Sequence, residues 1–424
     1  TQGYSSAASD VYKRQILVGV SINLAIKGDL FGSAEKAVSG TNDKTAQEQT
    51  RVDELMGELG RVEEQQRQDN LPGTRVTENT KYVSNGKTAW IPKGFTVSGI
   101  KSEQSIDNGL VIYDIPEGTT PDWSNPDSVK TKYNQFVWIP VEVKSTDTEN
   151  SIASFYRSAW AENASTGGER TTGLSTSYTE PNSTNDTADK TGIAGQITEL
   201  TKSIYKYGGF YIGRYEAGST TERQKSSSQT EEFVVQQDKY PYVLVIWGIK
   251  MSDVSIGAVY LCNNLYSKTN TNYGATSMLC TGASWDSMLD FIKDSSHSVT
   301  DSTTWGNYSN SETYKIYRGS LGVYSNSVYT WNTANATAGT EVTKGDEILL
   351  TTGATERNSS KNIYDVAGNC CEWTTESCRS FWRSAVGGGY SYDGSSLPAS
   401  GRNPTTPTPG YPGYGFRPVL YIKL

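Results

Sequence analysis

Residues 362–374 of the 424-residue chain read NIYDVAGNCCEWT, a run that combines glycine, small polar residues and tryptophan. Gly368 lacks a Cβ atom and therefore permits close backbone approach and a positive φ angle. Trp373 brings a large apolar surface to a chain whose hydrophobic residues make up only 35% of the total. Polar residues beside such an aromatic group typically bind buried backbone amides or form an internal ion pair. We therefore predict a structural role for Asp365, Gly368, Asn369, Glu372 and Trp373.

Other motifs surround this run in a fixed order, and they are FVWIPV (136–141), GGFYIGRYEAG (208–218), RSAVGGGYSY (383–392) and GYGFRP (413–418). Together with residues 362–374 they resemble the landmarks of the formylglycine-generating-enzyme and sulfatase-modifying family, whose fold is a variant of the C-type lectin fold. The resemblance implies a loop-rich α+β domain with two helices and a small twisted sheet. It adds Gly388, Phe416 and Arg417 to the residues expected to hold the domain together.

The composition limits the classes of function. The formal net charge is -8, and the 38 lysines and arginines are scattered, so the chain lacks the basic footprint of a nucleic-acid-binding protein. The 27 tyrosines and 10 tryptophans fit an aromatic, loop-rich fold. The single histidine, His297, argues against metal centres that need several imidazoles. We predict no metal and no cofactor, and calcium held by oxygen ligands, as in some domains of this fold, is the alternative.

The cysteines argue against an enzyme. We expect the five cysteines to be buried thiols, with a bridge between Cys262 and Cys280 as the alternative. Enzymes of the family use a cysteine pair between the Gly-Gly motif and the final Gly-Phe-Arg, and no cysteine lies between Gly389 and Gly415. Their iron-dependent sulfoxide-synthase relatives need several histidines. We therefore predict a protein that is not an enzyme, the alternative being a formylglycine-generating or sulfatase-maturation-type enzyme.

The N-terminal region predicts an anchor. Residues 1–15 contain DVYKRQ, which looks like the translation of a transposon end used in sequencing libraries, so we expect an artefact fused to a truncated gene. Residues 16–26 are mostly apolar and lead into a charged helix that ends near residues 71–73. This arrangement resembles the N-terminal helix of type IV pilin-like proteins, and an ordinary amphipathic helix is the alternative. The apolar stripe of the charged helix comprises Val52, Leu55, Met56 and Leu59.

Changes of composition divide the rest of the chain. Alternating runs predict strands between residues 76 and 143, an aromatic strand pair at 203–218, and helices around 250–265 and 284–293, the last with Ser284 as N-cap. The predicted segments are 1–15 (artefact), 16–71 (truncated pilin-like anchor and amphipathic helix), 72–143 (β-rich segment leading into the main domain), 144–202 (polar low-complexity insertion) and 203–424 (C-type-lectin-like domain).

Residues 390–414 differ from the rest of the chain. They read YSYDGSSLPASGRNPTTPTPGYPGY and contain no Lys, Glu, Gln, Met or Trp. The chain resembles the variable ligand-binding proteins of diversity-generating retroelements, which share the C-type lectin fold and end in a similar GFRP segment. In those systems, mutation of template adenines turns asparagine codons into a set that excludes these five residue types. Turn-rich loops favour Gly, Pro, Ser and Thr for backbone reasons, which is the alternative explanation.

We therefore expect residues 390–414 to form a diversified recognition patch whose side chains face water. The resemblance implies a surface-displayed, membrane-anchored binding protein at the cell surface, held by the truncated N-terminal helix, with a protein or glycan as ligand. A structural minor pilin whose loops bind nothing is a further alternative. The predicted ligand-binding residues are Tyr390, Ser391, Tyr392, Asp393, Leu397, Gly401, Arg402, Asn403, Tyr411 and Tyr414.

Overall fold

The computed structural model describes residues 42–181, 192–223, 230–249, 254–378 and 382–424. The chain divides into two compact units, residues 1–67 and residues 68–424. The artefact predicted at residues 1–15 and the apolar anchor predicted at residues 16–26 lie outside the described residues. Among the described residues, no helix is both long and apolar enough to cross a bilayer.

Helix α3 (Asn42–Asp69) is the charged helix that the sequence predicts, and it ends just before Leu71. Its charged residues favour a helix with water around it, and Arg67 near its end is paired with Glu64. The side chains of the predicted apolar stripe are exposed, namely Val52, Leu55, Met56 and Leu59.

A six-stranded sheet forms the centre of the second unit, with strand order β12-β24-β9-β5-β4-β3. Every neighbouring pair in it is antiparallel. The bounds are β3 (Thr96–Val97), β4 (Val111–Tyr113), β5 (Gln135–Pro140), β9 (Gly209–Gly213), β12 (Ala275–Leu279) and β24 (Pro418–Ile422). Strands from residues 72–143 thus lie in one sheet with strands from residues 203–424, so residue 203 does not begin a separate compact unit.

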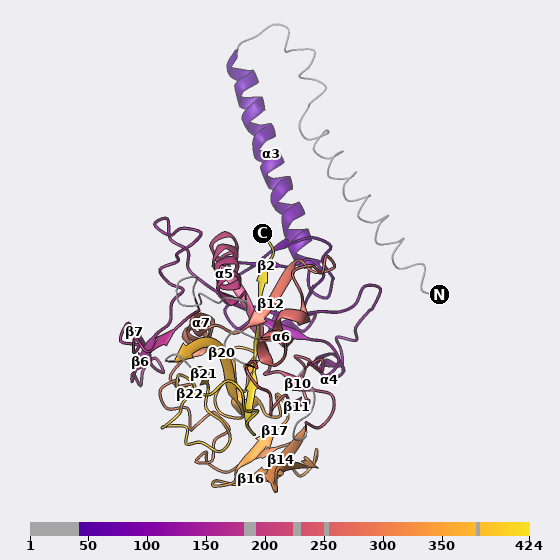
Figure 1. Cartoon of the computed structure of the whole chain (residues 1–424). Coiled ribbons are helices and arrows are strands. Elements are labelled where there is room, and N and C mark those ends of the chain that lie inside the picture. The colour runs from indigo at the N-terminus through magenta and orange to yellow at the C-terminus, as the bar shows by residue number, and fades with distance from the viewer. Residues whose placement is uncertain (1–41, 182–191, 224–229, 250–253, 379–381) are drawn as a thin grey trace. The chain divides into compact units, whose positions relative to one another are not determined.

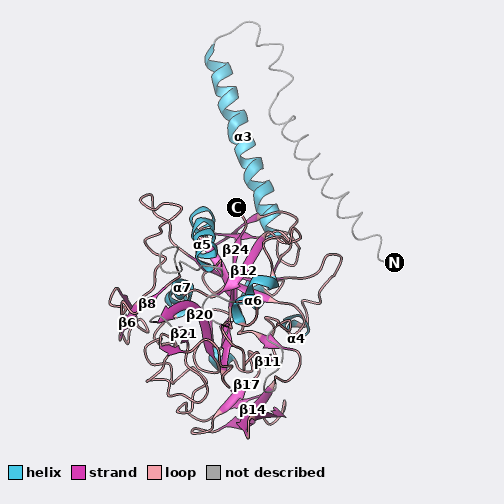
Figure 2. Cartoon of the chain, in the orientation of Figure 1, coloured by secondary structure: helices cyan, strands magenta, loops and turns pink. Residues whose placement is uncertain are grey.

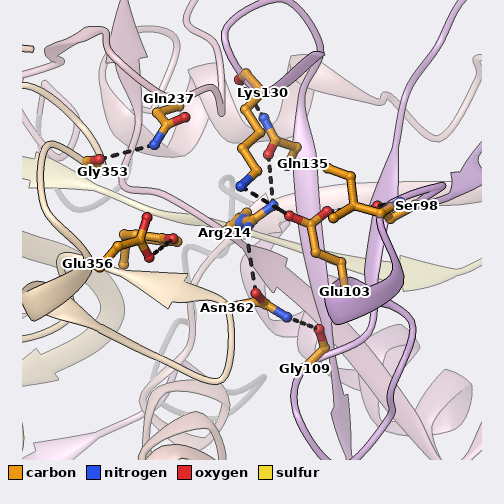
Figure 3. A network of polar contacts seen from close by, with 12 residues as sticks. Ser98, Glu103, Gly109, Lys130, Gln135, Arg214, Gln237, Gly353, Glu356 and Asn362 are labelled. Atoms are coloured by element: carbon orange, nitrogen blue, oxygen red, sulfur yellow. Dashed lines mark hydrogen bonds and ion pairs between the residues drawn. The ribbon is translucent and has the colours of Figure 1, made fainter. Parts of the chain in front are cut away.

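Buried charge ties the two parts of this sheet together. The Arg214 guanidinium donates to Glu103 Oε1 at 2.8 Å, Gln135 Oε1 at 3.1 Å and Asn362 Oδ1 at 3.4 Å (Figure 3). Burial by itself raises the pKa of Glu103, but Arg214 and Lys130 hold it below its ordinary value. A buried charge without a partner is costly. The ion pair therefore keeps the segment that carries Glu103 packed beside Arg214 and strand β9.

A second sheet carries the C-terminal motifs, with strand order β22-β21-β20-β23 and β8 paired to β20. Strand β23 runs parallel to β20, whereas the other pairs are antiparallel. The bounds are β8 (Tyr178–Thr179), β20 (Cys371–Cys378), β21 (Trp382–Val386), β22 (Arg402–Thr405) and β23 (Tyr414–Phe416). Figure 1 shows β20, β21 and β22 side by side.

The remaining strands form small sheets: β1 (Thr80–Ser84) with β2 (Lys87–Ile91), β6 (Ala159–Ala161) with β7 (Glu169–Thr171), β10 (Gly218–Ser219) with β11 (Tyr240–Pro241), β13 (Tyr314–Ile316) with β16 (Thr340–Val342), β18 (Ser359–Ser360) with β19 (Ile363–Tyr364), and β14 (Ser320–Ser325) between β15 (Val328–Thr333) and β17 (Ile348–Leu350). The strands predicted between residues 76 and 143 are present as β1 to β5. Figure 2 shows how much of this unit consists of loops between short strands.

The longer helices of this unit are α5 (Ile193–Tyr207), α6 (Ala258–Leu265) and α7 (Gly282–Ile292). The short helices are α4 (Pro126–Lys130) and the 3-10 helices η1 (Lys101–Glu103) and η2 (Glu356–Asn358). The strand predicted at the start of residues 203–218 is wrong, because that part ends α5. Its Ile and Tyr residues favour strands locally, but Leu200, Ile204 and Tyr207 are buried at helical spacing. The N-cap of α7 is Thr281, not Ser284, because Thr281 Oγ1 accepts a bond from Ser284 N at 3.0 Å.

The polar insertion predicted at residues 144–202 is attached to the domain. Its described part contains β6, β7 and β8, and Ile152 and Ser158 are buried. Ser158 N donates to the buried Asp286 carboxylate of α7 at 2.6 Å. Polar side chains can therefore fix this segment although it has few apolar residues of its own.

The core is aromatic, as the composition predicts, and Trp138, Trp247, Trp285 and Trp373 are fully buried. The second unit is a loop-rich mixture of helices and sheets dominated by strands. The prediction of an α+β class is confirmed at this level. The C-type-lectin-like assignment remains a prediction.

Candidate functional site

The frame of the candidate site is a buried ion pair between β20 and the link from β23 to β24. Arg417 Nε donates to Glu372 Oε2 at 3.0 Å and Nη2 donates to Oε1 at 2.6 Å. The guanidinium also donates to the carbonyls of Gly213 and Tyr364, both at 2.9 Å. Both charged side chains are almost fully buried. Bidentate pairing of this kind fixes the position as well as the charge of both groups, so the end of the chain is held to β20.

Residues 365–369 form a tight turn beside this pair. Asp365, Gly368 and Asn369 have φ angles of 58°, 73° and 59°. A Cβ atom on Gly368 would lie 2.1 Å from the carbonyl oxygen of Asn307, so only glycine fits there. Asn369 Oδ1 accepts bonds from Asn307 Nδ2 and Leu350 N, both at 2.9 Å. These contacts explain the glycine and amide residues of the motif as packing and backbone partners.

The other predicted structural residues are also internal. Trp373 Nε1 donates to the Val245 carbonyl at 3.0 Å, and the Phe416 ring lies 4.8 Å from the Phe233 ring. Gly388 has a φ angle of 68°, and a Cβ atom there would lie 2.2 Å from the Leu397 carbonyl oxygen. Gly388 thus fixes where residues 390–414 leave β21.

Two further carboxyl groups are buried near the frame. Asp365 Oδ2 accepts a bond from Gly353 N at 2.7 Å, while Asp365 Oδ1 and Glu216 Oε2 lack partners within the described part of the chain. Burial raises the pKa of Asp365 to about 7. Burial, reinforced by the charge of Asp365, raises the pKa of Glu216 as well. In the described residues no group of three or more His, Cys, Asp or Glu side chains is placed to hold a metal ion.

Residues 390–414, which we call the C-terminal patch, consist of a loop, strand β22 and a second loop that leads into β23. The pairing of β22 with β21 brings Asn403 opposite Ala385. Both loops therefore leave from a paired sheet, and their ends are fixed by Gly388 and Arg417. This arrangement lets side chains vary without changing the path of the sheet.

A polar aromatic cluster occupies the middle of the patch, and we call Tyr392, Asn403, Tyr411 and Tyr414 the tyrosine cluster. Asn403 Nδ2 donates to Tyr414 Oη at 2.6 Å and to Tyr392 Oη at 3.1 Å. The rings of Tyr411 and Tyr414 are 5.0 Å apart. Tyr392, Asn403 and Tyr411 are only partly buried. The cluster therefore holds aromatic rings and an amide in a fixed arrangement, and three of its four members are partly accessible to solvent.

The prediction that the patch faces water is wrong for Tyr390 and Tyr414. They are only 6% and 7% exposed. Tyr390 packs with Tyr329 and Cys370 in a small apolar core, and its hydroxyl lies 3.3 Å from Tyr329 Oη. The Tyr414 ring lies 5.5 Å from the Trp373 ring. Both tyrosines are therefore buried between the loops of the patch and the core.

The same prediction is wrong for Arg402, whose side chain is 6% exposed. Its Nε donates to Glu376 Oε1 at 2.8 Å and its Nη2 donates to Asp286 Oδ2 at 2.7 Å. Both carboxylates are fully buried. Arg402 therefore neutralises two acids of β20 and α7 and holds β22 to them.

The other predicted binding residues lie around the cluster. Ser391 is exposed. Asp393 caps its own loop, since its Oδ1 accepts bonds from the Ser395 hydroxyl at 2.6 Å and the Ser395 amide at 2.8 Å, and these bonds lower the pKa of Asp393. Leu397 packs against the core, and a Cβ atom on Gly401 would lie 2.8 Å from its side chain.

Three residues that matter to this region were missed from the sequence. Tyr329 lies on the β14–β15 hairpin and helps to hold the patch in place, because its hydroxyl also accepts a hydrogen bond from Gly413 N at 3.1 Å. Asp286 and Glu376 are the buried partners of Arg402. Asp286 could have been predicted as a buried acid that needs a partner, because it lies between Trp285 and Met288 in an apolar helix. No local pattern indicates the roles of Glu376 or Tyr329.

The cysteines and the histidine take no part in a reactive arrangement. All five cysteines are free and buried, as predicted, so the alternative Cys262–Cys280 bridge is absent. Burial raises the pKa of Cys262, Cys280, Cys370 and Cys371, which disfavours their thiolates. His297 Nδ1 lies 3.0 Å from Asp294 Oδ1 near the surface.

Comparison with known proteins gives little similarity. No protein-family model matches the chain. No curated protein matches it. Among solved structures, the chain is similar to Treponema denticola variable protein 1, with 14% sequence identity over 50% of this chain and 85% of that chain and a TM-score of 0.26. Agreement this weak carries no argument about fold or function.

Proposed function

We propose that the chain is a ligand-binding protein with a C-type-lectin-like domain, in which the exposed part of the C-terminal patch is a diversified recognition surface. The observation that carries the proposal is the tyrosine cluster on a rigid frame. Tyr392 and Tyr411 offer large rings with few rotatable bonds, and Asn403 adds an adaptable amide, which is the chemistry of antibody binding loops.

The division of the patch supports this proposal. Gly388, Arg402 and Arg417 hold the loops by close packing and buried ion pairs, while Ser391 is exposed and Tyr392 and Asn403 are only partly buried. Variation of the second group would change recognition without unfolding the domain. The absence of Lys, Glu, Gln, Met and Trp from residues 390–414 fits diversification of asparagine codons.

The patch carries one charged group that is not paired within it. Arg402 is paired with two buried carboxylates, whereas the Asp393 carboxylate accepts bonds from the amide and hydroxyl of Ser395, which lower its pKa and keep it ionised. Recognition would then depend on hydrogen bonds and ring contacts with a protein or a glycan. No nucleic acid is expected as partner, because the net charge is -8.

The proposal excludes catalysis as the function of this domain. Formylglycine formation in the family needs a reactive cysteine pair, and the patch contains no cysteine. The raised pKa of the nearby Cys370 and Cys371 thiols disfavours nucleophilic chemistry there. Calcium held by oxygen ligands, as in some domains of the C-type lectin fold, stays the alternative proposal for a bound ion.

The proposal places the protein at the cell surface, held by an N-terminal pilin-like helix that includes residues 16–26. The apolar composition of those residues and the charged helix after them support this part. Localisation of the natural full-length protein, by protease treatment of intact cells followed by fractionation, tests it. Protection of the protein inside intact cells would contradict surface display.

The experiment that tests recognition is sequencing of the natural locus and of sister copies. We expect a nearby reverse transcriptase gene and a near-identical repeat that differs at adenines. Substitutions should fall on exposed or partly buried positions such as Tyr392, Asn403 and Tyr411, and spare Gly388 and Arg402. Identical copies, or substitutions spread evenly over the domain, would refute the proposal and favour a structural protein whose loops bind nothing.

A further inference from the structure

A recess with no lining residue from the C-terminal patch lies between α5, α6, β12 and β24. Its volume is about 300 Å³, at the lower end of the sizes of small-molecule pockets. Its walls come from the first turns of α5, the end of α6 and the loop after it, and its floor comes from β12 and β24. A ligand here would be bound independently of the diversified loops.

The floor contains an unsatisfied hydroxyl group. Thr276 and Tyr421 are directly opposite each other on β12 and β24, and each is 3% exposed. Tyr421 Oη donates to Glu199 Oε2 at 3.0 Å. Thr276 Oγ1, by contrast, lacks a hydrogen-bond partner within the described part of the chain. Buried hydroxyls are normally bonded, and Thr276 lines the recess, so a ligand in the recess is a candidate for the missing partner.

The walls add further groups with free hydrogen-bonding capacity. Gln196 Nε2 donates to Asn263 Oδ1 at 3.0 Å, which leaves the Gln196 oxygen and the Asn263 amino group without partners among the described residues. Glu199 also forms an ion pair with Lys268, so the lining carries no net charge. The recess therefore offers both donors and acceptors to a neutral polar molecule.

The recess is both open and rigid. A Cβ atom on Gly192 or Gly195 would meet nothing within 4 Å, so the glycines of α5 leave space that other residues would fill. On the opposite side Ser277 fixes the loop after α6, because its Oγ donates to Cys262 O at 2.6 Å and accepts from Tyr266 N at 2.8 Å. A preorganised wall reduces the entropy lost when a ligand binds.

From these contacts we infer a second binding site for a small, neutral, polyhydroxylated ligand, such as a single hexose unit. Adjacent hydroxyl groups can donate and accept at once, which matches the Thr276 hydroxyl, the Gln196 oxygen and the Asn263 amino group. A charged ligand fits less well because Glu199 and Lys268 already neutralise each other.

The experiment measures binding of free D-galactose, D-glucose and D-mannose to the whole chain by saturation-transfer NMR. Two variants probe the recess. Gly195→Leu fills the space and favours the helix locally, and Thr276→Val removes the unpaired hydroxyl without changing the shape of the side chain. Gly60→Leu is the matched control, because Gly60 is a helical glycine with equally open surroundings.

We expect at least one sugar to give a saturable signal. Gly195→Leu should abolish it, Thr276→Val should weaken it by about five- to tenfold, the loss of one hydrogen bond, and Gly60→Leu should leave it unchanged. Thr276→Val should melt no lower than the wild type, which separates loss of binding from loss of folding. Absence of a saturable signal from all three sugars up to roughly 50 mM, far above the Kd of millimolar sites, would overturn the inference. Binding that survives both recess variants would overturn it as well.

Discussion

Replacement of Arg402 by alanine is expected to destabilise the domain strongly, although Arg402 lies within the C-terminal patch. The substitution removes the cation that Glu376 and Asp286 share, both of whose side chains are fully buried, and Glu376 keeps only its longer ion pair with Arg157, at 3.6 Å. Removal of one partner from a buried ion pair typically costs about 3–5 kcal/mol. The bond from Arg402 Nη1 to the Ser158 carbonyl at 3.2 Å is also lost. We therefore expect the free energy of unfolding to fall by about 3–5 kcal/mol, a large part of a typical total of about 5–15 kcal/mol.

Urea unfolding followed by tryptophan fluorescence measures this loss, and the neighbouring residue supplies the control. Asn403→Ala removes bonds to Tyr392 and Tyr414 at a partly buried position, so its cost should be about 1 kcal/mol. Arg402→Lys keeps the charge but loses the forked geometry and should fall between the two.

The comparison of the two alanine variants decides the role of Arg402. An Arg402→Ala protein that is no less stable than Asn403→Ala would refute the structural role of Arg402. The outward-facing interpretation of this side chain would then be restored.

Three further predictions concern the frame and its thiols. Asp365→Asn should flatten the pH dependence of the free energy of unfolding, which is measured by urea unfolding at several pH values. Because the pKa of Asp365 is raised to about 7, its stabilising contribution in the wild type is full below about pH 4 and is lost as the pH rises to about 7. Tyr329→Phe should lower the free energy of unfolding by about 1–2 kcal/mol, because the hydroxyl of Tyr390 and the amide of Gly413 lose their partner; an unchanged urea midpoint would argue against these bonds. The five cysteines should stay unlabelled by Ellman's reagent in the folded protein and react after denaturation, and rapid labelling of the native chain would contradict their burial.

Local signals predicted much of the framework. Glycines at positions 368 and 388, an internal ion pair among the polar residues of the motifs, and the strands before residue 143 follow from residue types with narrow physical uses. A charged helix ending near residue 71 is also a local property, because its residues favour a solvated helix. The last part of helix α5 was predicted as a strand, because its Ile and Tyr residues favour strands locally. Packing of this helix against β9 and β24 decided otherwise.

The sequence by itself determined that this chain is acidic and aromatic, that the motif around residue 368 serves packing, and that residues 390–414 have a restricted composition. Only the tertiary structure decided which residues of that patch reach solvent. Tyr390, Arg402 and Tyr414 resemble their exposed neighbours in residue type, but Tyr329, Glu376 and Trp373 come from distant parts of the chain to cover them. Burial depends on contacts between segments far apart in the sequence, and no local pattern contains that information.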